Sequence, residues 1–153
     1  MIEVNERINV PAPPQRVWEL LSDPRAVVDC VAGAALGEEH DDGTFDATMV
    51  IKFGPAKITF RAKVALELDA ATRTGHVTSK GRDNQGGTRF NARMTFAVTE
   101  QAEPQGSAID VKANVEISGR LASLVESGAS LVVKYMIGEF SKRLSARFTE
   151  AQA

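Results

Sequence analysis

The residue types that most often carry catalysis or bind metals are sparse in this sequence and lie far from one another. The two histidines are His40, in the acidic segment EEHDD, and His76, and neither has a second histidine or a cysteine at the spacing of a metal site. The single cysteine, Cys30, has no base near it in the sequence. We therefore predict solvent-exposed or structural histidines and a buried, inert thiol.

Sequence motifs for other chemistries are missing as well. The sequence has no Gly-x-Ser-x-Gly nucleophile motif, no phosphate-binding loop and no dinucleotide-binding fingerprint, and the Gly86-Gly87 pair is typical of a turn. The acidic residues from Glu38 to Asp42 are expected to form a solvated loop rather than a cation site. Glu6 differs, because it interrupts the apolar face of a predicted strand. It is either hydrated at an open end of the sheet or a candidate acid or base.

The last third of the chain has the pattern of one long helix. Between Gly119 and Phe148 there is no proline, and apolar residues recur at steps of three and four. About 30 residues at 1.5 Å each give a rod of about 45 Å, so this helix must cross most of a small domain. Its middle is apolar most of the way round, which predicts burial on more than one side. Gly128 and Gly138 interrupt it, and each costs about 1 kcal/mol relative to alanine unless close packing requires a glycine.

The rest of the chain has mainly the pattern of strands. Apolar and polar residues alternate with the period of two that is typical of strands with one buried face. The alternation covers residues 2–10, 45–53, 57–68, 74–82, 90–98 and 109–117, most weakly in 74–82. Two short helices are expected after the first strand, one starting at Pro13 or Pro14 and stopping at Asp23-Pro24, the other from Arg25 to Cys30. This order predicts a single α+β domain over residues 1–153, with a curved antiparallel sheet of about seven strands wrapped around the C-terminal helix.

A strongly curved sheet around one helix cannot close its interior at both ends, so we predict an apolar cavity between them. Its candidate walls are large side chains of the first short helix, the inward strand positions and the long helix: Trp18, Phe60, Met94, Phe96, Val132, Tyr135, Met136 and Phe140. Each of these residues, taken singly, could also be ordinary core. Methionine adapts to irregular ligands, and the Tyr135 hydroxyl could orient a ligand carbonyl. The pattern indicates a loosely specific site for an apolar small molecule, without catalytic residues or a metal.

Composition limits the function classes further. The net charge is −2 and the pI is near 5.7, which gives no whole-molecule argument for binding nucleic acid or an anionic membrane. Between Asp46 and Arg93, however, nine basic residues outnumber four acidic ones. This excess predicts a basic sheet face that could dock an acidic enzyme subunit or anionic headgroups, or merely keep the protein soluble. The single cysteine, a charged N-terminal segment without a secretory signal, and an apolar run too short to span a bilayer indicate a cytoplasmic protein.

The opening VPAPPQRVWELLSDP resembles the start of the SRPBCC superfamily, whose START-like members share the helix-grip fold. Within that superfamily, four short motifs resemble the CoxG family, which is named for the G subunit of carbon monoxide dehydrogenase: Asp29-Cys30-Val31-Ala32-Gly33-Ala34, Gly54-Pro55-Ala56-Lys57, Gly86-Gly87 and Gly119-Arg120-Leu121-Ala122. The resemblance spans nearly the whole chain. Ala32 departs from it, since the family usually has proline in this turn.

The resemblance implies a non-enzymatic accessory protein. Members of the family are associated with carbon monoxide dehydrogenase or related molybdenum hydroxylases, with recruitment of that enzyme to the cytoplasmic membrane, and with binding of a quinone or similar lipid in the helix-grip cavity. It therefore implies a peripheral membrane protein without a covalent cofactor. Other members of the superfamily are cyclases or hydratases, which leaves an enzymatic alternative that would use Glu6. A lipid-binding or sensing protein unrelated to carbon monoxide oxidation is a third reading.

Overall fold

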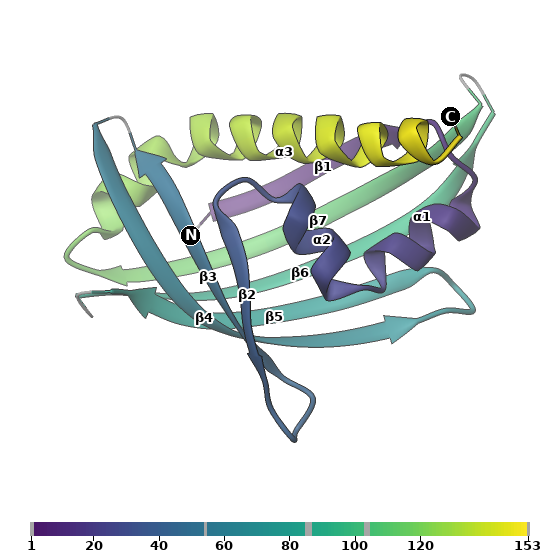
Figure 1. Ribbon diagram of the computed structural model, residues 1–153. Coiled ribbons are helices and arrows are strands. Elements are labelled where there is room, and N and C mark those ends of the chain that lie inside the picture. The colour runs from purple at the N-terminus through teal and green to yellow at the C-terminus, as the bar shows by residue number, and fades with distance from the viewer. Residues whose placement is uncertain (1, 54, 85–86, 103–104, 153) are drawn as a thin grey trace.

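The computed structural model of the protein describes residues 2–53, 55–84, 87–102 and 105–152, so Gly54 and Gly86 of the motifs above lie outside it. Within the described residues a curved, seven-stranded antiparallel sheet wraps around one long helix (Figure 1), as the sequence predicts. The elements in chain order are β1 (Ile2–Val10), α1 (Pro14–Leu21), α2 (Pro24–Cys30), β2 (Ala34–Glu39), β3 (Phe45–Phe53), β4 (Ala56–Asp69), β5 (Thr74–Asp83), β6 (Thr88–Gln101), β7 (Gly106–Gly119) and α3 (Ala122–Gln152).

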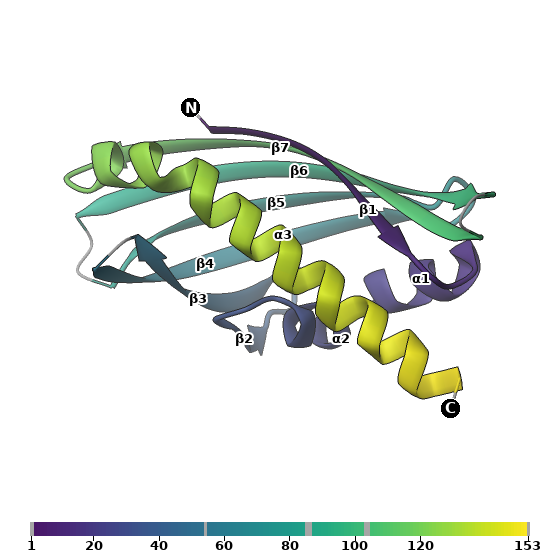
Figure 2. The same ribbon diagram turned by 90° about the horizontal axis from the view of Figure 1, so that it is seen from above.

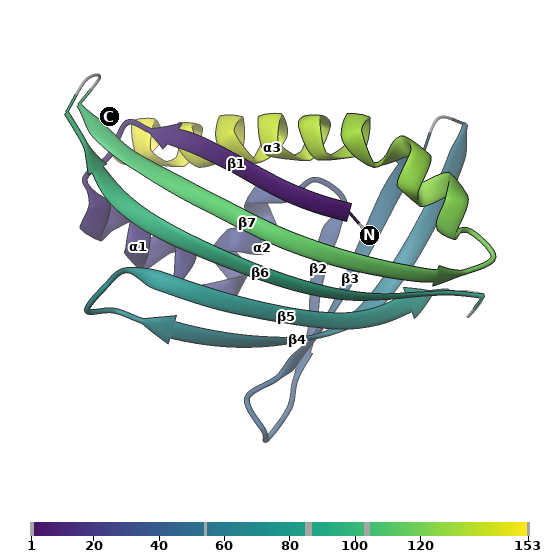
Figure 3. The same cartoon turned by 180° about the vertical axis from the view of Figure 1, so that it is seen from behind.

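The sheet has the strand order β1-β7-β6-β5-β4-β3-β2. The strands from β2 to β7 follow one another as neighbours, whereas β1 pairs with β7 at the far edge. The chain therefore passes from one edge of the sheet to the other between β1 and β2, and α1 and α2 form this connection (Figure 3). Seen from above, α3 runs obliquely across the strands on the concave side of the sheet (Figure 2).

The two short helices begin as their sequences require. α1 starts at Pro14, whose fixed φ and missing N–H suit the first turn of a helix. α2 starts at Pro24, and the Asp23 side chain before it accepts a hydrogen bond of 3.1 Å from the backbone N–H of Arg25. This is an N-cap, which satisfies one of the free N–H groups of the first turn.

β2 is the element that the sequence pattern does not reveal. It pairs with β3 through Ala34, Ala35 and Leu36, and its register shifts before Glu39. The expectation of a loop from Glu38 to Asp42 is therefore wrong for Glu38 and Glu39, which end this strand and are exposed. An edge strand of small residues with one large apolar side chain has too little alternation to be recognised.

The interior is divided into two buried cores. The first core joins α1, α2, β1, β6, β7 and the C-terminal half of α3, and includes Val17, Ile109 and Leu144, each at most 2% exposed. The second core is smaller and consists of Ile58, Phe60 and Val125 with half-buried neighbours. Cys30 belongs to the first core at 1% exposure, which confirms the predicted burial, and burial raises the pKa of its thiol.

Candidate ligand-binding site

Between the two cores, the inner face of the sheet is only half-buried. The strand register places inner side chains in rows across the sheet, and one row consists of Val4, Ala113, Met94, Val77 and Leu66, all half-buried. The next two rows toward the second core, which start with Ile2 and Ile117, are half-buried as far as β3. We call these three rows the central inner face. Val77 and Met94 in these rows pack against the first core, and Ile2 and Ile117 pack against the second. Their partial exposure means that α3 does not cover this face completely.

α3 bridges the two cores over the central inner face. Val132 packs against the second core, whereas Ile137 and Phe140 pack against the first. Between these contacts, Val133 and Met136 are half-buried and belong to neither core. The segments of α3 before and after its middle are thus anchored in the two cores, whereas the inner side chains of the middle, Val133 and Met136, are not fully packed.

Three of the predicted wall residues are buried at the ends of this region. Trp18 and Phe96 lie in the first core with ring centroids 6.1 Å apart. Phe60 lies in the second core, edge-on to the ring of Phe90 at 5.5 Å. Two of these rings cover strand glycines, since Phe96 lies over Gly75 and Phe90 lies over Gly81. The aromatic residues thus close the two ends of the inner face.

The remaining predicted wall residues divide between the inner face and solvent. Met94 lies in the central row, and Val132, Met136 and Phe140 are half-buried on the inner side of α3. Tyr135 is 61% exposed, so the structure does not place its hydroxyl where it could orient a ligand on the inner face. The reason is that α3 is apolar on both sides, and spacing alone does not tell which side covers the sheet.

Polar groups enter the inner face at its two ends. Glu6 lies on the inner side of β1 opposite Val111 and is half-buried, with no hydrogen bond or ion pair among the residues that the structure describes. At the other end, Asp83 and Thr88 are 3% and 0% exposed. Asp83 Oδ1 accepts a 3.0 Å hydrogen bond from the N–H of Gly87, and Thr88 Oγ1 accepts one of 2.9 Å from the N–H of Leu121.

Asp83 and Thr88 were not found by sequence reasoning. The alternation of β5 continued to Asp83 would have placed this carboxylate inward, opposite Phe60. Its second oxygen, Oδ2, is buried and has no hydrogen-bond partner among the described residues. Because the first oxygen and Thr88 hold the β5–β6 turn and the entry to α3, both residues fix the geometry of this end of the site.

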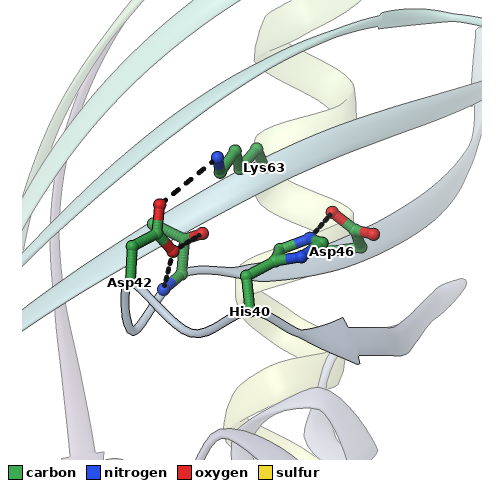
Figure 4. Close-up of polar contacts among 5 residues, drawn as sticks. His40, Asp42, Asp46 and Lys63 are labelled. Atoms are coloured by element: carbon green, nitrogen blue, oxygen red, sulfur yellow. Dashed lines mark hydrogen bonds and ion pairs between the residues drawn. The ribbon is translucent and has the colours of Figure 1, made fainter.

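A separate polar cluster occupies the β2–β3 hairpin, away from the inner face (Figure 4). His40 Nε2 lies 2.9 Å from Asp46 Oδ1, and this hydrogen bond is the main cause that raises the pKa of His40. Asp42 accepts hydrogen bonds from the hydroxyl and N–H of Thr44 at 2.6 and 3.0 Å, which lower the pKa of Asp42 to about 2. Lys63 Nζ lies 3.5 Å from Asp42. These contacts tie the hairpin together and agree with the expected structural role of His40.

The depressions on the outer face of the sheet have a different character. One is lined by Glu3, Asn91, Arg93, Asn114 and Glu116. Its charged and amide walls do not suit an apolar molecule.

Among the described residues there is no group of three or more metal-ligating side chains. In the same part of the chain, no helix has both the length and the apolar character to cross a bilayer.

Solved structures with the same architecture define the class of fold. A conserved protein from Geobacillus kaustophilus has a TM-score of 0.82 at 18% identity, covering 98% of this chain and 97% of that one. A START superfamily protein from Mycobacterium smegmatis has a TM-score of 0.58 at 15% identity, covering 97% and 98%. The ZhuI aromatase/cyclase from Streptomyces sp. R1128 has a TM-score of 0.53 at 15% identity, covering 94% and 95%. The fold is thus START-like helix-grip, the fold of the SRPBCC superfamily.

The sequence places the chain more narrowly within this class. Residues 7–149 match the profile of the CoxG family, the family of the carbon monoxide dehydrogenase G subunit. The protein therefore belongs to the CoxG family, as its motifs indicate. A search among curated protein sequences finds no significant match.

Proposed function

We propose that this protein binds a quinone or another lipid between α3 and the central inner face. In this proposal it is a non-enzymatic accessory protein that connects a carbon monoxide dehydrogenase-like molybdenum hydroxylase with the cytoplasmic membrane and its quinone pool. The observation that carries the proposal is the division of the interior into two cores with a half-buried, largely apolar face between them. Membership of the CoxG family supports the enzyme and the membrane as partners.

The chemistry of the central inner face suits an apolar ligand. Burial of about 300 Å² of ligand surface at roughly 25 cal/mol per Å² would contribute about 7 kcal/mol before the entropic cost of binding. Met94 and Met136, one on the sheet and one on α3, have flexible thioethers that adapt to ligands of different shape. We therefore expect affinity from area rather than from particular hydrogen bonds, and loose specificity.

The outer side of α3 supports contact with a membrane. Leu124, Leu131 and Tyr135 are 38%, 76% and 61% exposed. At 100° per residue they lie within about 40° of one another around the helix, and the exposed Lys142 lies on the same arc. Lys134 lies about 60° outside the arc on one side, and Glu139 about 40° outside it on the other. Exposed apolar side chains together with a tyrosine and a lysine on one arc suit the surface of an anionic bilayer.

Native mass spectrometry with organic extraction tests the ligand. The protein purified from its own cytoplasm is expected to carry a quinone or long-chain lipid at a ratio near one to one. A protein that is empty and also takes up neither added menaquinone nor added ubiquinone would contradict the carrier function.

Flotation with phosphatidylglycerol vesicles tests the membrane contact. Leu131→Gln should lower the bound fraction several-fold, because it removes the most exposed apolar side chain of α3. Leu68→Gln is the matched control, since Leu68 is 40% exposed at the end of β4. Equal binding of the two variants would contradict this role of α3.

The enzymatic alternative depends on Glu6, the half-buried carboxylate on the inner side of β1. It would be the acid or base for a polar substrate bound on the same face. Glu6→Gln distinguishes the carrier from the enzyme. In a carrier, this substitution should leave quinone or lipid uptake intact, whereas an enzyme that uses Glu6 as acid or base should lose activity. An empty wild-type protein would instead direct the search toward polar substrates.

A further inference from the structure

Basic residues concentrate on the outer face of strands β3 to β6. We call the following exposed residues the basic face: Lys52, Lys57, Arg61, Lys63, Lys80, Arg82, Arg89 and Arg93. The strand register sets like charges directly opposite one another. Arg61 pairs with Arg82, and Arg82 pairs with Arg89, so three guanidinium groups share one row across three strands. Lys63 and Lys80 are opposed in the next row.

This arrangement is unfavourable for the isolated protein. Like charges directly opposite on neighbouring strands destabilise a sheet. Among the described ion pairs only one involves the basic face, that of Lys63 with Asp42 at 3.5 Å. The whole chain has a net charge of −2, so positive charge is segregated onto this face rather than in general excess. An occupant that neutralises these charges would remove the repulsion.

We propose that the basic face docks an acidic surface of a partner protein. Arginine guanidinium groups bind carboxylates in bidentate geometry, and three of them in one row present a fixed array of donors. Among the residues whose exposure the structure describes, the large apolar side chains that are exposed are Leu68, Leu124, Leu131 and Tyr135, and none of them belongs to this face. The occupant is therefore anionic and polar rather than apolar.

The position of the basic face favours a protein over a lipid surface. The sheet is curved, and this face lies on its convex side, away from α3 (Figures 1 and 3). A flat bilayer would meet only the crest of a convex surface. If α3 rests on the membrane, as in the function proposed above, the basic face points away from the bilayer. This step rests on the proposed function, whereas the charge segregation does not.

A photo-crosslinking experiment in intact source cells tests the docking surface. A benzoylphenylalanine is placed at position 78, in place of the exposed Thr78 on the outer side of β5, which lies opposite Arg93 and beside the row of Lys63 and Lys80. The same protein is prepared with Arg61→Gln, Arg82→Gln and Arg89→Gln together. The matched control is Arg25→Gln, Lys112→Gln and Arg147→Gln together, which removes the same charge from exposed positions outside both the basic face and the membrane-contact side of α3.

The expected result is one cross-linked protein whose attached peptide belongs to an acidic surface. The basic-face variant should lose this cross-link, and its affinity for the purified partner should fall about tenfold or more at low salt. The control variant should keep both. The basic-face variant should also melt no lower than the wild type, because it loses repulsion.

Three results would overturn the proposal: no cross-link, a cross-link to lipid, or a cross-link that persists in the basic-face variant. Purified carbon monoxide dehydrogenase holoenzyme is the first candidate to compare with the captured protein. Native mass spectrometry of the same variants separates this inference from the proposed function. If the basic-face variant loses docking but keeps the apolar ligand, the docking surface is confirmed independently of ligand binding. If the wild-type protein carries no ligand but still cross-links, only the proposed carrier function is contradicted.

Discussion

At the scale of single residues, His40 offers a direct test of the β2–β3 hairpin. The pKa of His40 is raised above the ordinary value of 6.5, mainly by its 2.9 Å hydrogen bond to Asp46. We expect Asp46→Asn to lower the pKa of His40, because a neutral amide does not stabilise the imidazolium. NMR titration of the His40 ring protons measures the shift. Asp41→Asn, a charge removal in the adjoining turn, should leave this pKa nearly unchanged.

The same pair sets the direction of a pH dependence. A histidine whose pKa is higher in the folded protein contributes stability below its unfolded pKa and loses that contribution as the pH rises through its folded pKa. The difference in melting temperature between wild type and Asp46→Asn should thus be larger at about pH 6 than at about pH 9. A difference independent of pH would show that Asp46 stabilises the hairpin by other means.

Tyr135 and Met136 are neighbours in the chain with different environments. Tyr135 is 61% exposed, whereas Met136 is half-buried on the inner side of α3. We expect Tyr135→Phe to leave menaquinone affinity within about twofold. Met136→Gln should lower it about tenfold, since the ligand would cover a half-buried amide that has no hydrogen-bond partner there. Fluorescence titration of both variants measures this. A marked loss of menaquinone affinity in Tyr135→Phe would instead show that the Tyr135 hydroxyl contacts the ligand.

These two residues also show what sequence reasoning can and cannot predict about the site. Large apolar side chains at helical and strand spacing identify the interior, and seven of the eight predicted wall residues are buried or half-buried there. Tyr135 is the eighth. A helix that is apolar on two sides has no preferred direction in its pattern, so its inner side depends on where the sheet lies.

At the scale of elements, the glycine in the middle of α3 has no packing reason within the described chain. A Cβ added at Gly138 would meet no atom within 4 Å, whereas one added at Gly81 would overlap the Phe90 ring and the Arg61 carbonyl oxygen. We therefore expect Gly138→Ala to stabilise the fold by about 1 kcal/mol. Gly81→Ala should destabilise it by about 1–3 kcal/mol. Urea unfolding of both variants decides this, and destabilisation by Gly138→Ala would contradict the open surroundings of this glycine.

Strands can be predicted from this sequence where one face is solvent-exposed and the other buried, because only then do polar and apolar residues alternate. β3, β4, β6 and β7 alternate clearly and are found where the pattern places them, with ends that differ by up to a few residues. β2 is missed because its pairing depends on β3 rather than on its own side chains. The pairing of β1 with β7 also cannot be predicted from local pattern, because it joins opposite ends of the sequence.

At the scale of the whole molecule, α3 lies on the concave side of the sheet (Figure 1), and the basic face lies on the other side of the same sheet. The outer side of α3 exposes apolar residues with Lys142 among them, and the basic face exposes arginines and lysines without large apolar side chains among the described residues. An adaptor between a bilayer and a protein requires two such surfaces that can be occupied at once. The central inner face lies between them, so a ligand there would be adjacent to the membrane side through α3.

A large side chain placed on the central inner face tests whether the ligand binds between this face and α3. Ala113 lies in the central row between Val4 and Met94 and is half-buried. Ala113→Phe should occupy the adjoining space, so the ligand-free protein should melt at or above the wild-type temperature. Added menaquinone at about 100 times its dissociation constant should stabilise the wild type by about 2.7 kcal/mol and the variant hardly at all.

The matched control for this change is Ala97→Phe, at a half-buried alanine on the outer side of β6. Its phenylalanine points away from α3, so the control should respond to menaquinone as the wild type does. Calorimetric melting of the three proteins with and without menaquinone gives the comparison. A normal response of Ala113→Phe would place the ligand elsewhere, while loss of response in both variants would indicate a site that depends on the whole sheet.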